Sequence, residues 1–188
     1  MTALSPEDVD SVRHEAHAAV RALRSRKLAL DNDGIDMILG NARSHYAWTD
    51  QPVHPEILEA IYAITAAGPT SMNSCPARFV FVTSHEGKNR LARSLKPKNV
   101  DKMRAAPVTV IVAQDLEFWR HLPFLFPHED RRPMFEGKPA HIVATAFRNS
   151  TLQGAYFMIA ARAVGLDVGR CPDSRMRSST GSSSQTRH

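Results

Sequence analysis

Residues 68–82 read Gly68-Pro-Thr-Ser-Met-Asn-Ser-Cys-Pro-Ala-Arg-Phe-Val-Phe-Val82. A helical pattern ends at Gly68-Pro69, because proline lacks the amide that a helix needs and disfavours helical backbone in the residue before it. A strand is expected to begin at Arg78. The small hydroxyl and amide side chains between helix and strand suit two interpretations. They form either an ordinary turn or a loop that lines a flat polar ligand where a sheet begins.

Apolar periodicity predicts helices and two buried strands on either side of this stretch. The predicted helices cover residues 5–27, 35–42, 55–68, 87–95 and 140–165, and the predicted strands cover residues 79–82 and 107–113. The last helix is apolar over much of its circumference, which is typical of a central buried helix or of an oligomer interface. The segment 116–135 is rich in aromatic residues and proline. It suits a lid, a subunit-contact loop or a surface excursion that packs its own hydrophobic side chains.

The composition limits the class of protein. A chain of 188 residues with 43% hydrophobic residues predicts one domain with a real core. No apolar run approaches the ~18–20 residues that a membrane span needs, and the acidic, polar N-terminus differs from a secretory signal. Cys75 and Cys171 are too few for a disulfide framework or a zinc site. We therefore expect a cytoplasmic protein without a membrane or metal partner.

The formal net charge is +5, which suits anionic ligands. The excess is divided between residues 21–27 and the last nineteen residues instead of forming one patch. The sequence also carries no helix-turn-helix, zinc finger or aromatic ribonucleoprotein signature. We therefore predict no nucleic-acid partner.

Three polar motifs give weaker signals. His14-Glu-Ala-His17 is not a metalloprotease motif, since its histidines lie three residues apart instead of four, and a solvated helix face explains it. Cys75 is either a reactive thiol or a small buried residue. The run His128-Glu-Asp-Arg-Arg132 either binds a carboxylate through an arginine or is a solvated charged segment.

Several segments together resemble the FMN-dependent nitroreductase family. They are Arg43-Ser-His-Tyr-Ala-Trp48, the stretch from Gly68 to Phe81, Asn99-Val-Asp-Lys102 before Ala106–Ala113, Leu122-Pro-Phe-Leu-Phe-Pro-His128, and Thr145-Ala-Phe-Arg-Asn-Ser-Thr-Leu-Gln-Gly154. Their order and spacing look like the malonic semialdehyde reductase branch, which belongs to pyrimidine degradation. The resemblance covers residues 30–169.

The resemblance implies an α+β fold in which helices flank a mostly antiparallel sheet, and a homodimer with FMN in clefts at the subunit interface. The implied cofactor-binding residues are Arg43 and Ser44 with the adjacent His45 at the phosphate and ribityl chain, Pro69, Thr70, Ser71 and Asn73 along the isoalloxazine, and Asn99 and Lys102 at the flavin ring and ribityl region. The chemistry agrees, because a guanidinium fork suits a phosphate and a lysine near the ring would stabilise the negative charge of reduced flavin.

The implied activity is an NAD(P)H oxidoreductase that reduces a small aldehyde acid, malonic semialdehyde, to 3-hydroxypropionate. Hydride passes from NAD(P)H to the flavin and then to the substrate, so no catalytic residue is assigned in the protein. Arg131 or Arg132 is the candidate that holds the substrate carboxylate. The alternatives are a reductase of nitroaromatics or quinones, and a non-catalytic dimerising remnant.

Three regions are therefore expected. They are an N-terminal helical extension at 1–29, an incomplete nitroreductase-like domain at 30–169 and a disordered tail at 170–188 outside the family pattern. Family members continue beyond Gly169 with Pro-Met-Ser-Gly-Phe, whereas this chain reads Arg170-Cys-Pro-Asp-Ser174.

One set of codons for these five residues, CGA TGT CCG GAT TCG, encodes the family pentapeptide when a single C precedes it. The hypothesis is a frameshifted family gene that lacks its C-terminal strand and phosphate contacts, with impaired activity. The alternative is an unrelated natural tail, and resequencing the gene across the Gly169 codon distinguishes the two.

Overall fold

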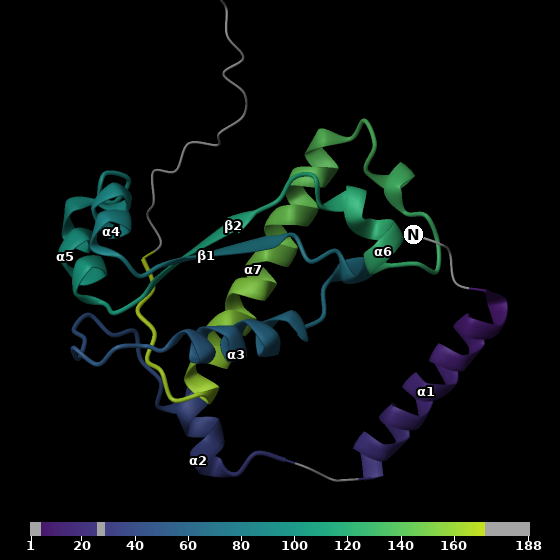
Figure 1. The fold of residues 1–188 in the computed structure, drawn as a ribbon, viewed down its shortest axis with the longest axis horizontal. Helices are drawn as coiled ribbons and strands as arrows, with labels where there is room; N and C mark the ends of the chain where they lie inside the picture. The colour runs from purple at the N-terminus through teal and green to yellow at the C-terminus, as the bar shows by residue number, and fades with distance from the viewer. Residues whose placement is uncertain (1–4, 26–28, 172–188) are drawn as a thin grey trace, which may run out of the picture. The chain divides into compact units, whose positions relative to one another are not determined.

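The computed structural model describes residues 5–25 and 29–171, and the chain divides into two units between Asp36 and Met37. The first unit contains α1 (Pro6–Ser25) and α2 (Asn32–Ile35) (Figure 1). At the start of α1 the Ser5 hydroxyl accepts the Asp8 amide at 3.2 Å, and the Asp8 carboxylate accepts the Ser5 amide at 3.1 Å. This reciprocal capping pattern confirms the predicted helix start.

The second unit is built on two antiparallel strands, β1 (Ala77–Val82) and β2 (Thr109–Gln114). Ala77 pairs with Gln114 at one end of the ladder and Val82 pairs with Thr109 at the other. Two helices, α4 (His85–Ala92) and α5 (Pro97–Ala105), lie in the connection between the strands. Figure 1 shows these helices at one end of the strand pair and α6 (Leu122–Leu125) at the other.

One face of the strand pair carries the main core. The long helix α7 (Pro139–Ala163) packs against both strands, and α3 (Pro55–Ala66) packs along α7. Ile61 of α3 and Ala160 of α7 are fully buried there, and Phe79 of β1 stacks on Phe157 with ring centroids 5.0 Å apart. Burial of this apolar surface supplies the driving force that joins helices to strands.

The aromatic segment 116–135 forms a second cluster. It folds into three short helices, η3 (Phe118–His121), α6 and η4 (Arg132–Met134). The side chains of Phe118, Leu122 and Phe135 are fully buried against Ala146 of α7. The segment thus packs its own hydrophobic side chains, which is one of the interpretations that the sequence left open.

The helices and the antiparallel pair confirm the predicted α+β class, with differences in detail. The helix predicted at 35–42 is wrong in position: α2 starts earlier, because the Asp31 carboxylate accepts the Gly34 amide at 2.8 Å, and a π-helical turn η1 (Asp36–Gly40) follows. Helix α5 was not predicted. No helix in the described ranges is long and apolar enough to cross a membrane. The tail prediction falls almost wholly on residues 172–188, outside the described residues.

Candidate functional site

The predicted phosphate-binding residues lie on an extended segment that runs beside the end of the family-like domain. Ser44 forms an isolated parallel bridge with Val168, and the His45 amide donates to the Val168 carbonyl at 3.2 Å. His45 Nε2 lies 3.2 Å from Asp167 Oδ1, with both side chains partly exposed. These contacts fix the segment against the chain that follows α7.

Lys102 of α5 meets the same segment. Its ammonium lies 4.3 Å from the centroid of the Tyr46 ring and donates to the Arg170 carbonyl at 3.3 Å. The indole nitrogen of Trp48 donates to the Lys102 carbonyl at 3.0 Å. The structure therefore brings together a group that we call the phosphate-side cluster. Its members are Arg43, Ser44, His45, Tyr46, Trp48 and Lys102.

Arg162 of α7 anchors the backbone of the cluster. Its guanidinium donates to the carbonyls of Ile38 and Arg43 at 3.2 and 3.3 Å. The Arg43 guanidinium itself is exposed and donates to the nearby carbonyls of Gly40 and Ala42 at 3.2 and 2.9 Å. Arg162 thus holds the backbone of the segment that contains Arg43. The Arg43 guanidinium stays at the surface, where an anion can reach it.

The hydroxyl-rich loop, residues 69–75, has an unusual backbone. Three of its non-glycine residues have positive φ: Met72 at 54°, Asn73 at 48° and Cys75 at 39°. Such angles are uncommon for residues with a side chain and persist only where surrounding contacts impose them. Here the Cys75 amide donates to Thr70 Oγ1 at 3.2 Å, which closes the loop on itself.

Helix α7 and its neighbours hold this loop from outside. Asn149 Oδ1 accepts the Ser71 amide at 2.8 Å, and Tyr156 Oη donates to the Pro69 carbonyl at 3.0 Å. Asn73 Nδ2 donates to the Leu125 carbonyl of α6 at 3.1 Å. A Cβ on Gly68 would overlap the Tyr156 ring, so the helix-to-loop junction needs a glycine. These contacts from α7 and α6 hold the loop in one position.

The two halves of the predicted site lie at opposite ends of the strand pair. The loop is bonded to Asn149 and the cluster to Arg162, and these residues are about 20 Å apart along α7 at 1.5 Å per residue. A groove of about 470 Å³ beside the loop is lined by Asn73, Cys75 and residues of α3, β1 and α6, but by none of the cluster. This groove therefore does not join the loop to the phosphate-side cluster within one chain.

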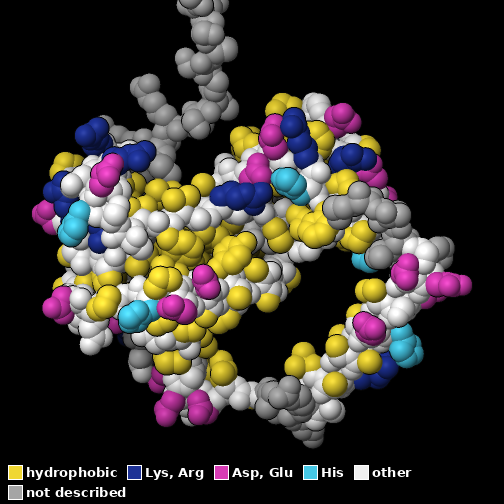
Figure 2. Space-filling view, viewed as in Figure 1, with side chains coloured by type: hydrophobic (Ala, Val, Ile, Leu, Met, Phe, Trp, Pro, Cys, Tyr) yellow, Lys and Arg dark blue, Asp and Glu magenta, His cyan; other side chains and the backbone are white. Residues whose placement is uncertain are grey.

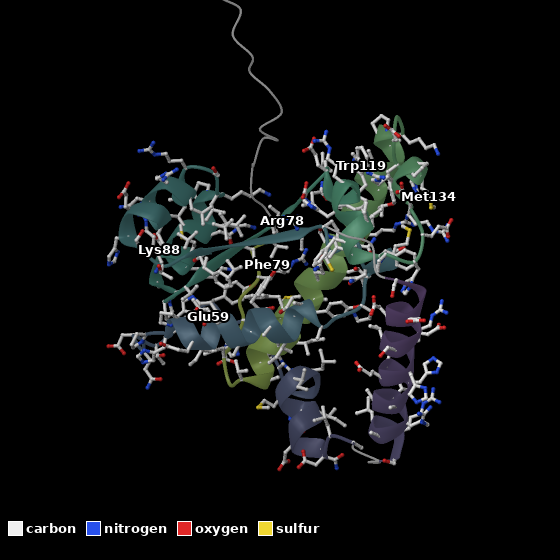
Figure 3. All side chains as sticks on the ribbon, turned by 45° about the vertical axis from the view of Figure 1, so that its right-hand side comes forward. Glu59, Arg78, Phe79, Lys88, Trp119 and Met134 are labelled. Atoms are coloured by element: carbon white, nitrogen blue, oxygen red, sulfur yellow. The ribbon has the colours of Figure 1, made fainter. Side chains whose placement is uncertain are left out.

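A second groove, of about 620 Å³, continues from the first between α3 and β1. It is largely apolar, and Glu59 and Arg78 contribute charges to its lining (Figure 3). Arg78 lies 2.6 Å from Asp115, which follows β2. Figure 2 shows hydrophobic side chains gathered over α3 and the strands on this face. Tyr62, which lines both grooves, is 53% exposed, so this is a face that a larger partner surface can cover.

The remaining predicted residues lie apart from both halves or inside the fold. Asn99 is buried in α5, with 7% of its surface exposed. Arg131 and Arg132 pair with their own neighbours, Glu129 at 2.6 Å and Asp130 at 2.7 Å. The Arg132 hydrogen bond lowers the pKa of Asp130 to about 2, so this pair stays charged at neutral pH. Among the described residues, no group of three or more metal-ligating side chains comes together.

Sequence reasoning missed four residues that the structure places at the site: Tyr46, Trp48, Asn149 and Arg162. The aromatic pair lies in the quoted segment Arg43–Trp48, so its position next to the arginine and serine was the available signal. Asn149 likewise lies in the quoted segment Thr145–Gly154. Arg162 carries no local signal, because it acts on backbone carbonyls more than a hundred residues away in the sequence.

Comparisons with known proteins give consistent matches. A sequence model described as "Nitroreductase family" matches residues 39–172. A Burkholderia lata protein named "Putative NADH dehydrogenase/NAD(P)H nitroreductase" is 53% identical over 140 residues, which cover 74% of this chain and 72% of that protein. A Stutzerimonas stutzeri protein of the same name is 51% identical over 140 residues, which cover 74% of this chain and 71% of that protein.

Solved structures share the fold. A structure from Exiguobacterium sibiricum, described as a "putative nitroreductase in complex with FMN", superposes with a TM-score of 0.63 at 24% identity, and the match covers 75% of this chain and 74% of that one. A Bacillus subtilis structure, described as a "putative nitroreductase", gives a TM-score of 0.64 at 17% identity and covers 73% of this chain and 74% of that one.

Proposed function

The chain belongs to the nitroreductase family, and from this premise we propose that it is an FMN-dependent NAD(P)H oxidoreductase. One observation carries the proposal. Trp48 and Tyr46 join the segment of Arg43 and Ser44 to Lys102, although more than fifty residues separate them in the sequence. The family resemblance grouped Arg43, Ser44 and Lys102 as flavin ligands, and these contacts hold their segments next to each other.

The donors of the cluster suit a phosphorylated flavin. Arg43 offers a planar guanidinium at the surface, and Ser44 offers an exposed hydroxyl beside it. An ammonium has three hydrogens, and Lys102 uses one of them on the Arg170 carbonyl, so it can also donate to a ligand. The set therefore supplies the positive charge and hydrogen-bond donors that a phosphate and a polar ring edge require.

When bound, FMN would accept hydride from NAD(P)H and pass it to the substrate. The residues of the chain would bind and orient. Arg43 and Ser44 would hold the phosphate and ribityl chain, and Lys102 would place a positive charge at the pyrimidine edge of the ring. The loop with Thr70, Ser71 and Asn73 would present hydroxyl and amide groups along the ring. Its positive φ values are consistent with a backbone held in place before any ligand arrives.

The test begins with purified protein. A flavin absorption spectrum is expected after FMN is added, followed by flavin reduction by NADH or NADPH without oxygen. One FMN per chain as purified, with normal turnover, would contradict the impaired activity predicted from the sequence. A substrate series then compares malonic semialdehyde with nitroaromatics and quinones. We propose malonic semialdehyde as the substrate, and the names of the relatives favour the nitroaromatic alternative. Protein that is colourless and takes up no added FMN supports the non-catalytic remnant instead.

We further propose a homodimer in which one chain's cluster and the other's loop share each flavin, because the two halves lie at opposite ends of the strand pair in a single chain. Two variants that we expect to be inactive, Lys102→Met and Asn73→Ala, test this sharing. When they are mixed, unfolded and refolded together, each mixed dimer contains one intact site, so activity should return to roughly a quarter of wild type. A site within a single chain predicts no recovery.

The cytoplasmic location and the boundaries at residues 29 and 169 stay predictions.

Asp130→Asn is expected to lower the KM for malonic semialdehyde by a factor of about 2–5, the scale of an exposed ion pair. The Arg132 guanidinium donates two hydrogen bonds, of 2.9 and 2.7 Å, to the Asp130 carboxylate, so it is not free to bind a substrate carboxylate. Because the pKa of Asp130 is lowered to about 2, the pairing is lost only as pH falls toward that value, and a neutral assay does not release Arg132. Arg132→Ala should raise the same KM.

A nitroaromatic substrate without a carboxylate is the matched control, and its KM should not respond to either change. If both variants leave the KM for malonic semialdehyde unchanged, Arg132 does not bind the substrate. The same comparison with Glu129→Gln and Arg131→Ala tests the other candidate arginine, which Glu129 holds at 2.6 Å.

A further inference from the structure

The carboxyl end of α5 is held by side chains from three other segments. The Lys102 carbonyl accepts from Trp48 at 3.0 Å, and the Met103 carbonyl accepts from Thr109 Oγ1 at 3.3 Å. The carbonyls of Arg104 and Ala106 both accept from the ammonium of Lys88. The Lys102 carbonyl also accepts the Ala106 amide at 3.3 Å. The later carbonyls of a helix have no partner inside the helix, so the donors from Thr109 and Lys88 satisfy groups that would otherwise be unpaired.

Lys88 is the unusual member of this set. It lies on α4 beside α5 (Figure 3), and only 6% of its surface is exposed. A buried ammonium is costly unless it is hydrogen-bonded, and among the described residues Lys88 finds its bonds on backbone carbonyls. A positive charge is also favoured there because the carboxyl end of a helix carries partial negative charge. The side chain therefore fixes the position of α5 relative to α4.

Lys102, the member of the phosphate-side cluster that α5 contributes, lies in this last turn of α5. Lys102 lies two residues before Arg104 and four before Ala106, whose carbonyls bind Lys88. A short helix moves as a unit, so loss of these bonds shifts the ammonium of Lys102 relative to Tyr46 and Arg170. That part of the cluster carries the charge expected at the flavin ring.

We propose that Lys88 is a positioning residue for the flavin: its buried ammonium clamps the end of α5 and so sets where Lys102 meets the ring. The inference rests on the proposed function. Lys88 does not itself touch the cofactor. Its effect is transmitted through the backbone of one helical turn, and it should appear in properties of the flavin that Lys102 controls.

The test uses the full chain with bound FMN and the variant Lys88→Met, which keeps the length of the side chain but has no donor. We expect FMN to bind about tenfold more weakly. The potential of the bound flavin should become more negative by about 30 mV, which is a tenfold smaller preference for the reduced form. Lys88→Arg keeps the charge and donors and should restore most of both. Lys88→Met added to Lys102→Met should shift the potential no further, because both act through one group.

Arg93→Met is the matched control, because it removes a positive charge from an exposed residue just after α4 and should change neither property. If Lys88→Met does not fold, Lys88→Gln, which can still donate to one carbonyl, should show the same shifts at smaller size. Wild-type protein that binds no FMN refutes the proposed function and this inference with it. Wild-type protein that binds FMN, beside a folded Lys88 variant of unchanged affinity and potential, refutes this inference alone.

Discussion

Gly169→Ala is expected to weaken FMN binding about 10- to 100-fold, or about 1.4–2.8 kcal/mol. A Cβ at this position would overlap the carbonyl oxygen of His45 and lie 2.7 Å from a ring carbon of Trp48. The carbonyl is a backbone atom that cannot rotate away, so the segment from Arg43 to Trp48 must move. Overpacking of this kind costs about 1–3 kcal/mol, and here the displaced groups are the predicted phosphate and ribityl ligands.

A flavin-fluorescence titration at fixed temperature measures this change. Gly154→Ala is the matched control. Gly154 lies inside α7, and a Cβ there would make an ordinary contact of 3.7 Å with Val112 of β2. That variant should bind FMN normally, and alanine should stabilise the helix by up to about 1 kcal/mol. Normal FMN affinity in Gly169→Ala would show that the flavin does not depend on the position of the segment 43–48.

Phe118→Ala is expected to lower the free energy of unfolding by about 3–5 kcal/mol. The Phe118 side chain is fully buried and meets Phe135 edge-to-face, with ring centroids 5.0 Å apart. Removing the ring leaves a cavity between the 116–135 segment and α7, and the buried apolar contacts that hold this segment are lost. Because Asn73 donates to the Leu125 carbonyl, the hydroxyl-rich loop should lose its support as well.

Urea unfolding followed by circular dichroism provides the measurement. Phe124→Ala is the control, since this phenylalanine lies on the adjacent helix α6 with 67% of its surface exposed. Its effect should stay within about 0.5 kcal/mol. If Phe118→Ala costs as little as Phe124→Ala, the 116–135 segment does not contribute a packed cluster to the fold.

The sequence predicted the elements whose apolar residues repeat clearly. Helices α1, α3 and α7 and both strands lie close to their predicted positions. Helix α5 was missed because it is mostly polar, with Val100 and Met103 as its long apolar residues. Its position depends on donors from Trp48, Thr109 and Lys88, and tertiary contacts of this kind leave no trace in local periodicity.

The candidate site was predictable as a set of residues but not as an arrangement. The family resemblance selected Arg43 and Lys102, and the structure brings their segments together. It could not indicate that the loop at Ser71 lies at the other end of the strand pair. Distances between segments depend on how α7 spans the domain, and local sequence patterns do not report that packing.

The bridge between Ser44 and Val168 affects when the site can form during synthesis. Arg162 and Arg43, which meet in the same region, are 119 residues apart in the chain. On the ribosome the proposed flavin-binding residues Arg43 and Ser44 therefore emerge long before Arg162 and Val168, which hold them. FMN binding must wait until these later residues have left the exit tunnel. Flavin loading is then expected to follow translation instead of accompanying it.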